Sequence, residues 1–206
     1  MKSESIAFGV AGILFGLIAG WIIGSQQAMS RPTPAAAQQS ASQPAPASGS
    51  STPAPPALDE SKAGNLKSAA NREPSNPDPR VQLGNLYFDA EHYDDAIKWY
   101  TDALKLAPND VNVITDLGVC YYYTNQPDKA LVEFDRSLKL DPKHAKTLLN
   151  VGVVKAFGKQ DLEGAEAAWQ QVIQVAPDSA EGQAAKRALE TMRSAHPNTG
   201  SRTPGD

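Results

Sequence analysis

The sequence LGNLYFDAEHYDDAIKWYTDALKLAP at residues 83–108 recurs in outline 34 residues later as LGVCYYYTNQPDKALVEFDRSLKLDP at residues 117–142. Both stretches begin with Leu-Gly and end with a proline that stops a helix-forming segment. A third, looser copy runs from Val151 to Pro177 and carries one extra residue near positions 159–161. An internal period of this length indicates stacked supersecondary units. The sequence therefore predicts an all-α solenoid of three helix-turn-helix units.

Small residues and aromatic residues recur at fixed places in these copies. A glycine follows the first apolar residue of each copy, and an alanine stands in its second half, so that the two helices of a unit can approach closely. An aromatic residue follows each alanine by four positions, and we expect it to fill the space between units. The glycines are Gly84, Gly118 and Gly152, the alanines Ala96, Ala130 and Ala165, and the aromatic residues Tyr100, Phe134 and Trp169.

This recurrence resembles the tetratricopeptide repeat (TPR) family, whose unit of 34 residues is a helix-turn-helix. On this resemblance the units are expected at residues 77–110, 111–144 and 145–178. The usual tryptophan near the start of each unit is absent, Ser137 replaces an alanine, and Lys155 occupies the tyrosine position of the third unit. These departures leave the predicted fold unchanged.

Both ends of the predicted stack need a cover, because a repeat buries its apolar face only against a neighbour. Residues 58–76 contain a helix-forming segment that stops at Pro74, and they are predicted to form an N-terminal packing helix. Residues 179–195 place apolar side chains on one helical face and are predicted to form a C-terminal capping helix. Residues 196–206 are expected to be a disordered tail.

The N-terminal part of the chain has a different composition. After a short flank at residues 1–5, residues 6–24 contain no charge and no strongly polar group. A helix of that length spans about the 30 Å hydrocarbon core of a bilayer, so we predict one transmembrane helix. Lys2 precedes it and no basic residue follows before Arg31, which favours a cytoplasmic N-terminus and a repeat domain on the periplasmic or extracytoplasmic side. Cleavage of this segment, giving a secreted binding protein, is the alternative.

Four glycines follow one another at steps of four residues within this apolar segment: Gly12, Gly16, Gly20 and Gly24. Small residues at that spacing let two membrane helices pack closely, which favours a homodimer through the transmembrane helix. The alternative is that glycine is simply common in membrane helices.

Residues 25–57 are rich in proline, alanine and serine, and Arg31 is their only charge. Such a composition cannot bury a core, so we predict a disordered, extended linker between the membrane helix and the repeats.

The sequence contains no set of residues that indicates catalysis. Its single cysteine, Cys120, excludes an intramolecular disulfide, and a small buried residue is expected there. None of the histidines (His92, His144, His196) has ligand partners at the spacing of a metal site. The net charge of −4 gives no reason to expect nucleic acid. We therefore predict that the chain is not an enzyme and takes no cofactor or metal.

The resemblance implies a concave face lined mainly by the first helix of each unit. This face is more apolar and aromatic than contact with water requires, which is typical of a surface for a partner protein. The residues expected there are Val81, Asn85, Phe88, Asp89, Thr115, Asp116, Val119, Tyr122, Tyr123, Lys146, Leu149, Asn150, Val153 and Phe157.

One subset of the family grips C-terminal carboxylates with lysine, asparagine and arginine side chains at defined inner positions. Asn85 and Lys146 match that pattern, whereas Val81, Asp116 and Asn150 do not. Because Asp116 would repel a carboxylate, the resemblance does not extend to this specialised function.

We therefore expect a membrane-anchored scaffold or adaptor that binds a peptide or helix of a partner protein in its concave groove. The alternative is a homo-oligomeric structural element of the membrane or envelope, assembled through the glycine stripe and the repeat domain. A repeat domain that stays monomeric at residues 58–195 would favour the first reading.

A double substitution tests the role of the glycines in the membrane segment. Replacing Gly16 and Gly20 by Leu should abolish self-association of the anchor, because the larger side chains keep two helix backbones apart. The readout is a reporter of helix association in membranes, and unchanged association would contradict the prediction.

Overall fold

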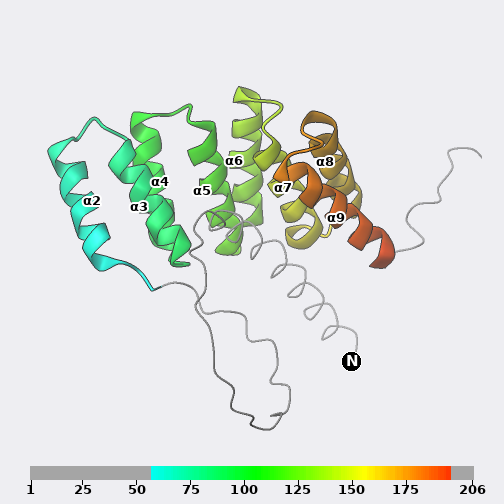
Figure 1. The fold of residues 1–206 in the computed structure, drawn as a ribbon, viewed down its shortest axis with the longest axis horizontal. Coiled ribbons are helices and arrows are strands. Elements are labelled where there is room, and N and C mark those ends of the chain that lie inside the picture. The colour runs from blue at the N-terminus through cyan, green and yellow to red at the C-terminus, as the bar shows by residue number, and fades with distance from the viewer. Residues whose placement is uncertain (1–56, 196–206) are drawn as a thin grey trace, which may run out of the picture. The chain divides into compact units, whose positions relative to one another are not determined.

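In the computed structural model, residues 57–195 are described, and this part of the chain contains helices and no strand (Figure 1). The helices are α2 (Glu60–Arg72), α3 (Asp78–Asp89), α4 (Tyr93–Leu106), α5 (Val111–Tyr123), α6 (Pro127–Leu140), α7 (Ala145–Val153), the π-helical segment η1 (Val154–Gly158), α8 (Leu162–Val175) and α9 (Ala180–Ala195). The predicted all-α architecture is confirmed for these residues.

Several sequence predictions lie outside the described residues. These are the flank 1–5, the transmembrane helix 6–24 with its four glycines, nearly all of the linker 25–57, and the tail 196–206. Within residues 57–195, no helix combines the length and the apolar character needed to cross a membrane.

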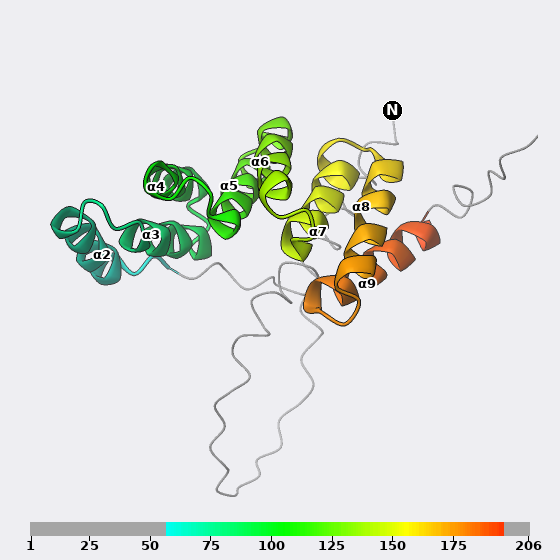
Figure 2. The ribbon, with the colours of Figure 1, turned by 90° about the horizontal axis from the view of Figure 1, so that it is seen from above.

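Successive helices pack against one another along the described part of the chain. The closest pairs are α3 with α4, α5 with α6, and α7 with α8, so each predicted unit is a pair of packed helices. Figure 2 shows α3 and α5 along one side of the row and α4 and α6 along the other. The first helices of successive units thus share a face.

Helix starts and turns follow from local chemistry. The side chains of Asp59, Asp110 and Asp161 accept hydrogen bonds from backbone N–H groups in the first turns of α2, α5 and α8. The turn inside each unit contains one residue with left-handed backbone, at φ 59° for Glu91, 59° for Asn125 and 56° for Gln160. The turns therefore repeat as regularly as the helices.

The two helices of a unit are held together by a ring that lies against a glycine. A Cβ atom built on Gly84, Gly118 or Gly152 would come closer than 3.0 Å to Tyr100, Phe134 or Trp169, respectively. These three rings are almost completely buried. Each ring therefore lies against the glycine of its own unit, where the missing side chain leaves room. Tyr100 and Phe134 also share buried clusters with residues of the next unit, as predicted: Val113 and Ile114 for Tyr100, and Val154 for Phe134.

The third unit absorbs its extra residue in a π-helical turn. α7 ends at Val153 and η1 continues to Gly158, so the extra residue is absorbed directly before positions 159–161, near which it was predicted. Lys155, at the family's tyrosine position, lies 3.5 Å from the Asp161 carboxylate. An ion pair at the surface thus replaces an aromatic contact.

The helices at both ends contribute to the core. In α2, Ala63 is fully buried in a cluster with Leu83 and Tyr87. In α9, the buried face is formed by Gly182, Ala184, Ala185, Ala188 and Leu189. Both helices therefore cover an end of the stack.

Two glycine-to-alanine substitutions test the packing account. Gly118→Ala should lower the free energy of unfolding by about 1–3 kcal/mol, because the new Cβ atom would overlap the Phe134 ring. Gly64→Ala is the matched control: Gly64 lies in the exposed face of α2, where an added Cβ meets nothing within 4 Å. This control should raise the free energy of unfolding by about 0.5–1 kcal/mol. Urea unfolding measures both, and equal effects would contradict the account.

Candidate peptide-binding face

The predicted face residues lie on the first helices α3, α5 and α7 and on η1. Two of them, Asn85 and Asp89, are exposed. The half-buried members are Val81, Phe88, Asp116, Val119, Tyr122, Tyr123, Lys146, Asn150 and Phe157. Eleven of the fourteen predicted residues therefore have surface that a partner could contact.

Three predicted face residues do not lie at the surface. Thr115 is 0% exposed, Leu149 5% and Val153 7%. The prediction that they contact a partner is wrong, because neighbouring helices cover them. Thr115 forms hydrogen bonds with side chains of α6 and α7, and Leu149 and Val153 are core residues of α7. Mapping from an ideal repeat misses these contacts with neighbouring helices.

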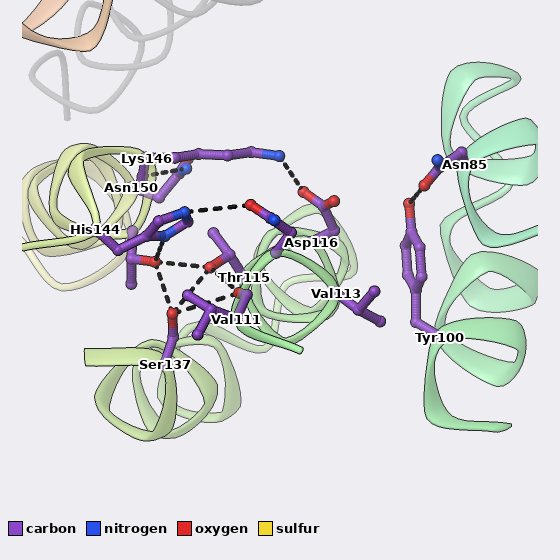
Figure 3. Close-up of polar contacts among 12 residues, drawn as sticks. Asn85, Tyr100, Val111, Val113, Thr115, Asp116, Ser137, His144, Lys146 and Asn150 are labelled. Carbon is purple, nitrogen blue, oxygen red and sulfur yellow. Dashed lines mark hydrogen bonds and ion pairs between the residues drawn. The ribbon is translucent and has the colours of Figure 1, made fainter. Parts of the chain in front are cut away.

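The polar part of the face joins the second and third units. Lys146 Nζ lies 2.5 Å from the Asp116 carboxylate, and the Asn150 side-chain amide donates to the Lys146 carbonyl at 2.8 Å (Figure 3). Burial raises the pKa of Asp116, and the adjacent Lys146 opposes that shift. The cation that could attract a carboxylate is therefore already paired with an acid of the same chain.

Toward the first unit, the face contains a hydrogen bond between the two helices of that unit. Tyr100 donates its hydroxyl proton to the Asn85 side-chain oxygen at 2.7 Å, so a group of the second helix orients a group of the face. The pKa of the exposed Asp89 carboxyl is raised by partial loss of hydration; Lys62 opposes this shift, and the negative charge of Asp116 adds to it. The exposed edge of the face thus carries one carboxyl group and one amide.

An aromatic cluster occupies the end of the face near the turns of the first two units. The rings of Tyr93 and Tyr123 stack at 4.4 Å between centroids, and Phe88 contacts both edge-on at 5.5 Å and 6.1 Å. Tyr122 lies 6.0 Å from Tyr123. Burial raises the pKa of Tyr123 to about 12, so its hydroxyl stays protonated.

Tyr93 was missed by sequence reasoning. It is the first residue of α4, a second helix, so the rule that first helices line the face excludes it. Its position directly after an inter-helix turn, beside the aromatic end of α3, is the signal that could have found it.

A hollow of about 490 Å³ borders this aromatic cluster. Three carboxylates line it without a lysine or arginine, which favours a cationic group over an anionic one. Its lining residues are Glu91, His92, Tyr93, Asp94, Asp95, Tyr123, Thr124 and Gln126.

A buried polar cluster lies beneath the face, between the second and third units. The hydroxyl oxygens of Thr115, Ser137 and Thr147 lie 2.7–3.1 Å apart in all three pairs. His144 reaches this cluster with its Nδ1 atom, 2.6 Å from Thr147 Oγ1, as Figure 3 shows. In the sequence, Ser137 stands where the family has an alanine. Its hydroxyl group is part of this cluster, so the departure from the family pattern is explained by these contacts.

Candidate metal ligands and the single thiol were also located in the described part of the chain. Among residues 57–195 no cluster of three or more His, Cys, Asp or Glu side chains could hold a metal ion. Cys120 is buried, as predicted, and burial raises the pKa of its thiol, which keeps it in the unreactive form.

Comparison with known families supports a TPR-like fold. Residues 82–198 match the family described as the cilia and flagella-associated protein 70 middle TPR-like domain, which is more than half of the 206 residues. No curated protein sequence matches the chain.

Solved structures show the same fold. MamA is 18% identical with a TM-score of 0.54, and the alignment covers 65% of this chain and 80% of MamA. The first TPR of Spaghetti (RPAP3), solved with the HSP90 peptide SRMEEVD, is 23% identical with a TM-score of 0.51, covering 67% and 95%. The Sgt2 TPR domain from Aspergillus fumigatus is 28% identical with a TM-score of 0.54, covering 63% and 86%. The predicted TPR resemblance is confirmed.

The charge of Asp116 can be tested with an acidic probe peptide. The wild-type chain should bind a labelled peptide with acidic C-terminal residues weakly, because Asp116 repels its carboxylate and occupies Lys146. Asp116→Asn removes the repulsion and frees Lys146, and should tighten binding about fivefold, equivalent to about 1 kcal/mol.

The matched control is Asp135→Asn, which breaks the exposed ion pair with Lys139 on the second helix α6. Fluorescence anisotropy measures all three proteins. Equal affinity of the wild-type chain and Asp116→Asn would contradict this role for Asp116.

Proposed function

The chain belongs to the family of the cilia and flagella-associated protein 70 middle TPR-like domain, and we propose that it binds a partner protein through the shared face of α3, α5 and α7. The ligand is a peptide segment or a helix that lies along this face. The observation that best supports this proposal is that eleven of the predicted face residues, on successive first helices, are exposed or half-buried.

The chemistry of the face supports a protein ligand. Half-buried aromatic side chains at one end can bury apolar groups of a partner, and such residues dominate the binding energy of protein interfaces. The amide groups of Asn85 and Asn150 can pair with a partner's polar groups. In the RPAP3 structure a TPR domain holds a peptide, which makes the same mode reasonable for this chain.

An acidic peptide such as the HSP90 peptide in the RPAP3 structure is not the ligand that this face favours. Asp116 pairs with Lys146, and three further carboxylates line the hollow beside the aromatic cluster. A segment with basic and aromatic or aliphatic residues complements this surface better than an acidic C-terminus does.

We also propose that residues 6–24 anchor the chain in a membrane, with the N-terminus in the cytoplasm and the repeats on the far side. The support is the apolar composition of that segment and its flanking charge. The chain would then act as a membrane-bound scaffold or adaptor for its partner.

Site-specific crosslinking tests the proposed function. A photoreactive amino acid at position 122, in the full-length chain expressed in its host cells, should capture a distinct protein. The same amino acid at position 132 is the control, because Val132 is 65% exposed on the second helix α6. Capture of the same protein from both positions, or of the chain alone from position 122, would contradict the proposal.

A double substitution then measures the contribution of the aromatic residues. Tyr122→Ala with Phe157→Ala should weaken binding of the captured protein at least about tenfold, because truncating two interface aromatics costs more than about 1 kcal/mol each. Circular dichroism should show nearly unchanged helicity, since both side chains are half-buried.

The control for this variant removes two apolar side chains that do not lie on the face. Val132→Ala with Leu140→Ala truncates exposed residues of α6 and should leave the affinity unchanged. Loss of folding in the aromatic variant would show that its residues belong to the core, and unchanged affinity would place the binding surface elsewhere.

A further inference from the structure

The hollow where the first two units meet has a counterpart where the second unit meets the third. Positions in different units can be matched through the one residue of each turn with left-handed backbone: Glu91, Asn125 and Gln160. Three residues after it, Asp94 of the first unit corresponds to Asp128 of the second. Directly before it, Thr124 of the second unit corresponds to Lys159 of the third.

At the junction of the second and third units, an acid is paired with a cation of the next unit. Lys159 Nζ lies 2.6 Å from the Asp128 carboxylate. Beside this ion pair the two turns are in close contact, because a Cβ atom built on Gly158 would come 2.9 Å from the Cβ atom of Pro127. A lysine of the third unit thus neutralises the acid of the second.

Among the described residues, the junction of the first two units has no such cation. Asp94 and Thr124 both line the hollow, but threonine is short and uncharged. Its hydroxyl group donates to the Cys120 carbonyl at 3.0 Å and accepts from the Gln126 amide at 2.9 Å, so it is held within its own unit. Within residues 57–195, neither Asp94 nor Glu91 takes part in an ion pair.

The hollow therefore carries negative charge that the described residues do not neutralise. Of its three carboxylates, only that of Asp95 is paired, with Lys98 of the same helix at 2.9 Å. The acids also lie in the first turn of α4, where the helix dipole favours them. That role does not replace a partner, because Asp128 lies in the first turn of α6 and is nevertheless paired with Lys159.

The aromatic cluster supplies the apolar part of the hollow. Tyr93 corresponds to Pro127, and Tyr123 corresponds to Gly158, so the stacked rings take the place of the contact between those two residues. Both tyrosines line the hollow together with the acids. Lysine and arginine bury their methylene groups against apolar surface while the charged head stays at polar groups. The lining therefore suits both parts of such a side chain.

We propose that this hollow is a binding site for a cationic side chain, lysine or arginine, which takes the place that Lys159 holds at the next junction. The charged head pairs with Asp94 and Glu91, and the methylene groups lie against the two tyrosine rings. That the cation belongs to the bound partner segment rests on the proposed function, because the aromatic cluster borders both the hollow and the shared face of the first helices.

Methyl NMR of the full-length chain in one detergent tests the site with small probes. Threonine methyl groups are labelled with ¹³C, and the Thr124 resonance, assigned with Thr124→Ser, reports on the hollow. Thr101 of α4 does not line the hollow and reports non-specific effects. The probes are Nα-acetyl-lysine amide, Nα-acetyl-arginine amide and the uncharged Nα-acetyl-norleucine amide, at pH 7.5 and low salt.

A cationic probe should shift the Thr124 resonance in a saturable way, and the norleucine probe should not. An equal response to norleucine, or no response to either cation, would overturn the proposal. The lysine and arginine titrations also show which of the two side chains the hollow prefers.

Matched substitutions locate the charge that binds the probe. Asp94→Asn should weaken binding of the cationic probe about threefold, which is the order of effect of an exposed ion pair. Asp128→Asn makes the same change at the corresponding position, where Lys159 is the partner, and should leave the affinity unchanged. Equal effects of the two substitutions would overturn the assignment to Asp94.

A lysine introduced at position 124 tests whether the site serves the partner. Thr124→Lys gives the first junction the cation that the second already has, so it should bind the captured protein at least about fivefold more weakly than Thr124→Gln, the uncharged control. Equal affinity of these two variants would overturn the assignment of the cation to the partner. The probe titrations need no partner, so the site stands on them even if position 122 captures no distinct protein.

Discussion

The fold depends on the contact between a glycine of the first helix and a large buried ring of the second. The space beside Gly84, Gly118 and Gly152 is filled by the ring of the same unit, so an added methyl group would overlap it. This close approach fixes the distance and angle between the paired helices. Because the contact recurs in three units, the units have nearly the same shape and stack in one direction.

The shared face is a consequence of this stacking. Once each second helix is held behind its first helix, α3, α5 and α7 present equivalent positions on one side of the row. Those positions carry side chains that differ from unit to unit, aromatic near the first turns and ionic between the second and third units. The repeat thus provides the framework, and the variation within it gives each part of the face a different chemistry.

The architecture could be predicted from the sequence because local packing rules decide it. A small residue, a ring and a helix-stopping proline at a fixed period can be recognised without knowing any distant contact. The caps at Asp59 and Asp110 likewise involve residues two or three positions apart. The π-helical turn at Val154–Gly158 could not be predicted, because the sequence shows that a residue is extra but not which backbone hydrogen bonds absorb it.

The candidate face was harder to predict because it depends on contacts between units. Thr115 looks accessible from its position in the repeat, and only its contacts with Ser137 and Thr147 bury it. These partners lie 22 and 32 residues away, beyond the reach of any helical period. Tyr93 was missed for a similar reason. It lies on a second helix, and it belongs to the aromatic cluster because its ring stacks on Tyr123 of the next unit.

The central claim is that a partner lies along the first helices, and hydrogen exchange measured by mass spectrometry tests it most directly. The full-length chain would be compared with and without the protein captured from position 122. The account predicts slower exchange in α3, α5 and α7 with little change in α4, α6 and α8. Protection confined to the second helices would contradict it.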